Sequence, residues 1–454
     1  FRIGQRDPST LVQKAGVQDV RLYNRALSAD EIKALGQGSE LAWLLAKSPE
    51  HRGKKENAAL YTGWLNFVDQ EYQAATSALS NLEGEKAGIL ARGFTTHVMQ
   101  EKETEPEAFL LYRGEYDKRR DRVTPGTPAI LPPMPESFPR NRLGFAQWLL
   151  LPDHPLTARV TVNRFWQELF GMGLVRTTGD FGVAGEMPSH PELLDWLAVE
   201  FRESGWDVKR LFKLIVTSAT YRQSAQTTPD KLAKDPENRL LSRGPRFRMD
   251  AEMVRDHALF ASGLLAPKLG GPSVKPYQPD GVWEAVAMTQ SNTRFYKQDE
   301  GESLYRRSLY TFWKRAAPPA LMETFNAPNR ETCTVRRERT NTPLQALATL
   351  NDVTFIEAAR HLAQRALQEC NKPREHLDFM ALQLMGRPLR AEERRVAEGV
   401  LSDLLIYYKS APKDAEALLG VGESKVSAEL DQPTLAAYTM VANQLMNLDE
   451  VLSK

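Results

Sequence analysis

The amino-acid sequence predicts a mainly α protein, an irregular multi-helix domain with long loops, preceded by a short β segment at the N-terminus. Two observations carry this prediction. After residue 140, apolar residues recur at helical spacing between helix start and stop signals, and no run of alternating apolar and polar residues occurs. Near the N-terminus, by contrast, residues Val17 to Tyr23 alternate with a period of two, as a half-buried strand does.

The first 140 residues divide into three parts. In residues 1–35, Ser28 and Glu31 form an S-x-x-E pattern, which predicts a capping box that opens a short helix. Residues 36–120 are predicted to be a helical connector, because apolar residues fall at helical spacing on a polar background: Leu60, Trp64, Phe67, Val68 and Tyr72. Residues 121–140 contain six prolines, which favour an extended segment and predict a domain boundary.

Residues 141–454 are predicted to form one helical domain. A helix should end at Gly171, and Ser189 and Glu192 predict a second capping box at the start of the next helix. The remaining predicted N-caps are Asp207, Asp250 and Thr342, with long loops expected at Gly179 to Ser189 and Gly270 to Thr293. The apolar stripes of the first three helices predict one core cluster: Phe165, Trp166, Leu169, Leu194, Leu197, Phe201, Leu211, Phe212 and Ile215.

Composition narrows the classes of function. The net charge is +1, so no overall field attracts nucleic acid, and no nucleic-acid partner is expected. The basic runs at Lys118 to Arg122 and Val335 to Arg339 each contain an acid, which favours ion-pair networks over a phosphate-binding track. No apolar run approaches the roughly 18 residues of a transmembrane helix. Cys333 and Cys370 are the two cysteines, which leaves room for a single disulfide bridge.

Several catalytic signatures are missing from the sequence. There is no C-x-x-C-H haem attachment motif, no H-E-x-x-H, no G-x-S-x-G and no phosphate-binding P-loop. Cys333 begins C-T-V-R-R, in which Val335 stands where the C-x-P-x-R sulfatase signature has proline. The sequence therefore predicts that this chain binds no haem. It also favours the interpretation that this part of the protein is not an enzyme.

One loop gathers ionisable groups next to a predicted helix start. Asp180, Glu186 and His190 lie within eleven residues, and a helix N-terminus attracts anions. These three side chains are candidate ligands of a divalent metal. The alternative, which we favour, is that Glu186 and His190 satisfy backbone groups of the loop, which is expected to be buried beside Trp196.

Three further residues complete the candidate polar site. Arg164 lies beside Phe165 and Trp166 and is expected to pair with a buried acid, and Arg255 and Asp256 are candidates for the same cleft. A cleft lined by arginine, aspartate and histidine could hold a sulfated or carboxylated sugar. A structural ion-pair network would involve the same residues, and this is the interpretation that we favour.

The longest motif is NRFWQELFGMGLVRTTGDFGVAGEMPSHPELLDWLAVEFRESGWDVKRLFKLIVTSATYRQS, from Asn163 to Ser224. Similar agreement is found in YRGEYDKRRDRVTPGTPAILPP (Tyr112 to Pro133), RFRMDAEMVRDHALFASGLLAPKLGGPSVKPYQP (Arg246 to Pro279), YRRSLYTFWKR (Tyr305 to Arg315), FNAPNRETCTVRRERTNTPLQALATLND (Phe325 to Asp352) and ANQLMNLDEVL (Ala442 to Leu452). Together these segments resemble the planctomycete-specific C-terminal domain family, known as domain of unknown function 1553.

A second resemblance concerns the N-terminus. FRIGQR and GVQDVRLYNRALSADEI (Gly16 to Ile32) resemble the end of a concanavalin A/laminin G-like jelly roll. A jelly roll needs about eight strands, so residues 1–35 are expected to be the C-terminal remnant of such a lectin domain, in a fragment of a longer protein.

The two resemblances imply an exported, multidomain protein, located in the periplasm, the envelope or outside the cell, that carries lectin-like and cytochrome c-like modules. We expect this chain to act there as a scaffold or binding module, with polysaccharide or envelope proteins as partners. One alternative is a polysaccharide hydrolase whose site surrounds Asp180 to His190. Another is a docking surface for haem modules of the full-length protein.

Overall fold

The computed structural model describes residues 20–27, 29–93, 96–100, 102–104 and 107–454. Its described part is mainly α, as predicted, and contains one small antiparallel sheet. The chain divides into two compact units between Val123 and Thr124. Within the described residues, no helix is both long and apolar enough to cross a bilayer.

The described residues of the N-terminal unit form three helices and a hairpin. Its elements are α1 (Ala29–Ala46), α2 (Lys54–Phe67), α3 (Gln70–Arg92), β1 (Ala108–Leu111) and β2 (Arg119–Val123), with 3-10 turns at Pro49–His51 and Tyr112–Gly114. The predicted helices therefore form, but Trp64, Phe67, Val68 and Tyr72 of the expected apolar face are exposed.

The predicted N-terminal strand is tested only in part. Residues 17–19 and Ser28 lie outside the described residues, and Val20 to Tyr23 have no regular secondary structure. The sheet that the structure does contain lies at residues 108–123, where Ala108 pairs with Val123 and Leu111 with Arg119. The jelly-roll origin of residues 1–35 accordingly stays a prediction.

The C-terminal unit is built from helices and long loops. Its first half contains α4 (Arg142–Leu149), α5 (Thr157–Phe170), α6 (Pro191–Glu203), α7 (Val208–Val216), α8 (Pro229–Lys234) and α9 (Ala251–Ser262). Then follow α10 (Val282–Val286), α11 (Ala320–Thr324), α12 (Pro343–Asn351), α13 (Val353–Glu369), α14 (Pro373–Met385), α15 (Ala391–Ser410), α16 (Pro412–Leu419) and α17 (Gln432–Met446), with 3-10 turns at Gly301–Tyr305 and Ser308–Tyr310.

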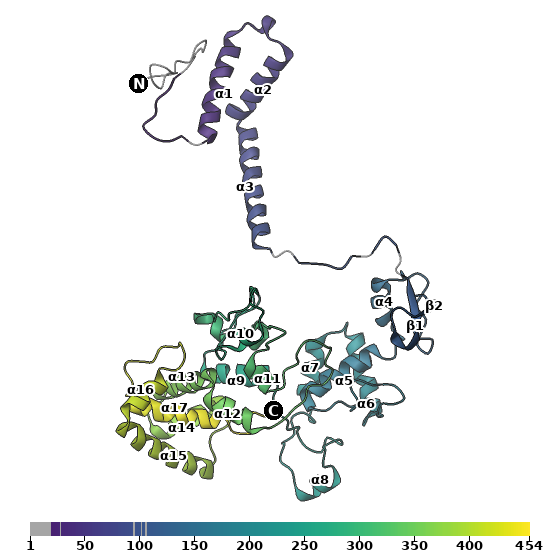
Figure 1. Cartoon of the computed structure of the whole chain (residues 1–454), viewed down its shortest axis with the longest axis vertical. Coiled ribbons are helices and arrows are strands. Elements are labelled where there is room, and N and C mark those ends of the chain that lie inside the picture. The colour runs from purple at the N-terminus through teal and green to yellow at the C-terminus, as the bar shows by residue number, and fades with distance from the viewer. Residues whose placement is uncertain (1–19, 28, 94–95, 101, 105–106) are drawn as a thin grey trace. The chain divides into compact units, whose positions relative to one another are not determined.

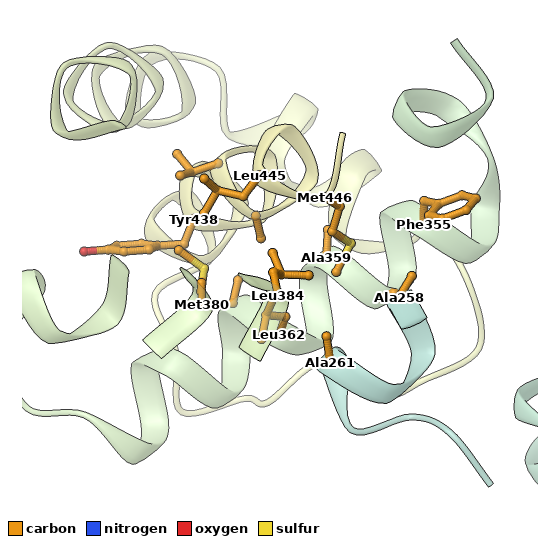
Figure 2. Packing of buried hydrophobic residues seen from close by; sticks show 14 of the residues in the cluster. Ala258, Ala261, Phe355, Ala359, Leu362, Met380, Leu384, Tyr438, Leu445 and Met446 are labelled. Atoms are coloured by element: carbon orange, nitrogen blue, oxygen red, sulfur yellow. The ribbon is translucent and has the colours of Figure 1, made fainter. Parts of the chain in front are cut away.

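The larger core of this unit surrounds α13. This helix lies beside α17 and is also packed by α9 and α14 (Figure 1). Small side chains let the backbones approach, since Ala359 of α13 and Ala258 and Ala261 of α9 are buried among larger neighbours such as Leu362 and Met446 (Figure 2). Burying large aliphatic side chains in such an interface stabilises the fold by about 1.5–3 kcal/mol each.

The smaller core is the predicted one. Trp166, Phe201, Leu211 and their neighbours from α5, α6 and α7 form one buried cluster, and Trp166 is 5% exposed. Of the nine predicted members, Phe212 contacts the cluster through Phe165, with ring centres 5.2 Å apart, and the other eight belong to it or pack against it. The prediction of a three-helix core is confirmed.

Helix-end predictions were confirmed in part. Asp207 accepts a hydrogen bond from the Arg210 backbone, and Thr342 forms a capping box with Gln345. Asp250 stands at the N-cap of α9 without a capping bond from its side chain. The capping box predicted for Ser189 and Glu192 was wrong, because α6 starts one residue later: His190 is its N-cap, and the Ser189 hydroxyl lies 3.0 Å from the His190 ring.

Residues 264–319 have little regular secondary structure, and arginine side chains hold their backbone. Arg306, which is 4% exposed, donates hydrogen bonds to the carbonyl oxygens of Lys268, Gly270 and Pro272. Its guanidinium also stacks on Tyr310, 3.8 Å from the ring centre. Side-chain donors thus satisfy backbone groups that a helix or sheet would otherwise satisfy.

Candidate functional site

The C-terminal end of α5 forms one wall of a pocket. Gly171 ends the helix in the left-handed region, at φ 79°. A side chain there would also collide with Phe247, since a Cβ atom would lie 2.6 Å from the Phe247 ring. Glycine is therefore required twice, for the backbone conformation and for the close approach of the segment around Phe247.

Asn163 fixes the next turn of the chain. It is completely buried, and its amide bonds both backbone groups of Val175: its Nδ2 donates to the carbonyl at 3.0 Å, and its Oδ1 accepts from the N–H at 2.8 Å. The adjacent Leu174 carbonyl accepts a hydrogen bond from the Ser189 N–H at 2.9 Å. The loop of residues 177–189 therefore starts and ends on the same rigid support, next to α5.

The predicted carboxylates of this loop are both engaged. Asp180 turns the loop by accepting the Gly182 N–H at 2.7 Å. Glu186 pairs with Arg239 at 2.8 Å, and the hydrogen bond from Arg239 lowers the pKa of Glu186. No bond links either carboxylate to His190. Within the described residues, no three His, Cys, Asp or Glu side chains are close enough together to hold a metal ion.

The pocket itself lies between α5 and the segment of residues 225–247 and has a volume of about 400 Å³. We call it the α5 pocket. It is lined by the aromatic residues Trp166, Phe170 and Phe247, by Ser189 and Glu237, and by three arginines, Arg239, Arg243 and Arg246. Trp166 and Phe170 stack with ring centres 4.1 Å apart. The pocket therefore combines aromatic surface with an excess of positive charge.

Salt bridges and hydrogen bonds hold the arginines in place. Arg243 donates to the backbone carbonyls of Asp235 and Pro236, both at 2.8 Å. Arg246 pairs with Asp449, and Glu237 pairs with Arg176 at 2.9 Å. A guanidinium has five N–H donors, so these arginines are oriented by the protein and keep donors for a ligand.

The other three predicted site residues lie elsewhere. Arg164 is exposed, so its expected pairing with a buried acid was wrong. Arg255 is 2% exposed and donates to the carbonyls of Leu304 and Arg306 at 2.6 and 2.9 Å. Asp256 accepts the Ser308 N–H at 2.7 Å. This pair thus holds the irregular segment around residues 304–308, and its hydrogen-bond partners include no residue of the Asp180–His190 loop.

The expected burial of the loop beside Trp196 was also wrong, because Trp196 is 52% exposed and Val183 of the loop is fully exposed. The two basic runs, in contrast, are engaged in ion pairs as expected: Arg122 with Glu107, and Arg337 with Glu252. Cys333 and Cys370 are both free, so the bridge that the sequence left open is not formed.

A second polar cluster surrounds the buried carboxylate of Glu357. Glu357, which is 1% exposed, accepts hydrogen bonds from the Tyr305 hydroxyl at 2.9 Å and from the Ser424 N–H at 2.5 Å, and Arg360 lies 3.6 Å away. Burial, reinforced by the Glu357 carboxylate, raises the pKa of Tyr277 to about 12. These groups fasten the loop of residues 421–424 to α13.

The arginines of the α5 pocket were not predicted from the sequence. They belong to the segment DPENRLLSRGPRFR, residues 235–248, which has the composition of a solvated loop. Its one distinctive signal is the recurrence of Arg239, Arg243 and Arg246 at intervals of three or four residues, although the segment is not a helix. The pocket depends on contacts such as Arg239 with Glu186, which lie 53 residues apart in sequence.

Comparison with known proteins identifies the family. No curated protein matches the chain, and no solved structure matches it. The family model PSD1, described as "Protein of unknown function (DUF1553)", matches residues 141–401, which is more than half of the chain and includes the smaller core, the α5 pocket and part of the larger core. The chain therefore belongs to the PSD1 (DUF1553) family.

Proposed function

We propose that this chain is a binding module, and that its ligand is a segment of polysaccharide carrying carboxylate or sulfate groups, bound in the α5 pocket. The observation that carries the proposal is the combination of Arg239, Arg243 and Arg246 with aromatic surface in one pocket. Guanidinium groups bind carboxylate and sulfate through paired hydrogen bonds. The pocket volume of about 400 Å³ suits one or two sugar units.

Arg239 is the arginine best placed to meet such a ligand. Its present partner, Glu186, is a surface carboxylate with a side chain that is 45% exposed. An exposed ion pair contributes at most about 1 kcal/mol, so a carboxylate or sulfate of the ligand can take over donors of Arg239 at little cost. In this role Glu186 keeps the guanidinium aligned until the ligand arrives.

Binding is favoured over hydrolysis by the state of the acids. Glycoside hydrolases use a carboxylic acid whose pKa is raised, so that it can protonate the leaving group. Arg239 lowers the pKa of Glu186 instead, and Glu237, the acid that lines the pocket, is paired with Arg176. Glu186 is thus suited to hold an arginine rather than to donate a proton, and Glu237 is already engaged by Arg176. A docking surface for haem modules remains the other alternative.

The wider setting is also a proposal. The resemblance to exported multidomain proteins implies that the module works outside the cytoplasm, attached to lectin-like and cytochrome c-like modules. In that setting a weak pocket for one anionic sugar gains affinity from repetition along the polymer, because each further contact is intramolecular. The module would then act as a scaffold that keeps the protein on a polysaccharide surface.

The test compares the binding of dextran sulfate, polygalacturonate and neutral dextran by isothermal titration calorimetry. The wild-type chain should bind one or both anionic polymers and not dextran. Arg239→Gln should weaken that binding about tenfold, the loss expected from one charge-assisted contact. Arg159→Gln is the matched control, because Arg159 also pairs with a single exposed acid, Asp195, but lies outside the pocket.

Two results would contradict the proposal. Equal binding by the wild type and both variants would place the anion elsewhere, and equal binding of dextran would remove the role of charge. Hydrolysis of either anionic polymer, measured as new reducing ends, would favour the hydrolase alternative.

A further inference from the structure

The long helix α3 exposes an apolar stripe. None of its 23 residues is buried. Four large apolar side chains, Tyr72, Leu79, Leu82 and Ile89, are between 41% and 62% exposed. The helix nevertheless begins at a well-formed N-cap, where the Asp69 carboxylate accepts the Tyr72 N–H at 2.8 Å. A helix with a defined start and an unburied apolar stripe needs a partner.

The spacing of the stripe specifies the kind of partner. Tyr72, Leu79, Leu82 and Ile89 follow intervals of seven, three and seven residues, which places them at the a and d positions of a heptad repeat. The intervening core positions are Ala75 and Lys86. We propose that α3 pairs with α3 of a second copy of this chain in an antiparallel, two-stranded coiled coil.

Lys86 decides between the two orientations. In a parallel, in-register pair each core residue meets its own copy, which would place two Lys86 ammonium groups against each other. In an antiparallel pair centred between Leu79 and Leu82, these two leucines meet, Tyr72 meets Ile89, and Lys86 meets Ala75. The small alanine leaves room for the lysine stem to cross the seam and bring its charge to solvent.

The charges at the helix ends agree with this orientation. Glu71 and Arg92 occupy equivalent positions beside the seam, near opposite ends of α3. In the antiparallel register each Glu71 faces the Arg92 of the other copy, so both ends of the pair gain an ion pair. In the parallel register Glu71 faces Thr76, and Arg92 has no residue of α3 opposite it. The antiparallel arrangement also places the two helix dipoles favourably.

The first experiment measures self-association of the full chain by analytical ultracentrifugation over a hundredfold range of concentration, roughly the range over which a weak dimer dissociates. The wild type should show a concentration-dependent dimer. The double variant Leu79→Glu, Leu82→Glu should be monomeric throughout. The double variant Ala74→Glu, Ala91→Glu adds the same charge on the outer face of α3 and should still dimerise. A wild type that is monomeric at every concentration would overturn the proposal.

The second experiment tests the orientation. Glu71→Arg and Arg92→Glu should each weaken the dimer several-fold, and the double variant should associate more tightly than either single variant. This recovery is informative because both changes oppose the helix dipole, so it cannot come from a more stable isolated helix. A double variant as weak as the weaker single variant would exclude the antiparallel pairing. Far-UV circular dichroism checks that α3 stays helical in every variant.

Discussion

Two helices of the same protein, α3 and α13, form in opposite environments. α13 buries ten of its 17 residues, whereas α3 buries none of its 23. The sequence of α3 also includes Gly84 and Gly88, which are poor helix formers. Because isolated helices are marginal in water, α13 is stabilised by its neighbours in the chain, whereas α3 relies on local signals such as its N-cap and on the proposed second copy.

The largest expected difference in stability between the two units comes from replacing a tryptophan by alanine. Trp166→Ala should lower the free energy of unfolding by about 3–5 kcal/mol, because it empties a buried site in the smaller core. Trp64→Ala in α2 should change it by less than about 1 kcal/mol, since that side chain is 46% exposed. Urea unfolding followed by far-UV circular dichroism measures both. Similar losses for the two variants would contradict the exposed position of Trp64.

Replacing a glycine by alanine should have opposite effects on stability in the two units. Gly422 has φ 85°, and a Cβ atom there would lie 2.4 Å from the Glu357 carboxyl carbon. Gly422→Ala should therefore destabilise the C-terminal unit by about 1–3 kcal/mol. Gly84 of α3 has open space around it, so Gly84→Ala should increase helicity and stabilise α3 by about 0.5–1 kcal/mol. Thermal melts of the two variants provide the measurement, and a loss at Gly84 would imply a close neighbour on that face.

The smallest effect is expected from a partly exposed ion pair in the C-terminal unit. Arg387 bonds Glu393 at 2.8 Å and lowers the pKa of that carboxyl from 4.5 to about 2. A carboxyl group whose pKa is lowered on folding stabilises the folded state at pH values above its unfolded pKa of 4.5. That contribution is lost as the pH falls from 4.5 towards 2. The wild type should therefore be modestly more stable than Glu393→Gln at neutral pH. This difference in the free energy of unfolding should vanish near pH 2.

Urea midpoints of the two proteins across that pH range test this expectation. The exposure of the Glu393 side chain, 35%, keeps the difference small. A difference that grew on acidification would mean that the pair destabilises the folded state.

The sequence predicted best what depends on neighbours along the chain. Asp207 and Thr342 cap helices as their patterns indicated, and the stripe around Trp166 is buried. The prediction that Arg164 is buried was wrong, and helix geometry explains why. Arg164 lies two residues before Trp166 and therefore about 200° away around the helix. The burial of Trp166 therefore implied the exposure of Arg164.

The α5 pocket could not be predicted in the same way. Helical periodicity says which face of α5 is buried, but not that Phe247 closes against Gly171, or that Arg239 reaches Glu186. These contacts join segments 50 or more residues apart, and the segments involved are loops without a regular period. The sequence identified the Asp180–His190 loop as unusual and missed the arginines that give it a pocket.

The arginines that hold residues 264–319 have a consequence for the order of folding. Arg255 reaches the carbonyls of Leu304 and Arg306 across about fifty residues, and Arg306 in turn orders residues 268–272. Without α9 in place, Arg255 cannot be delivered to this segment, and the loop that must close is long. We therefore expect residues 264–319 to acquire native hydrogen-exchange protection last, after α9 has docked on α13.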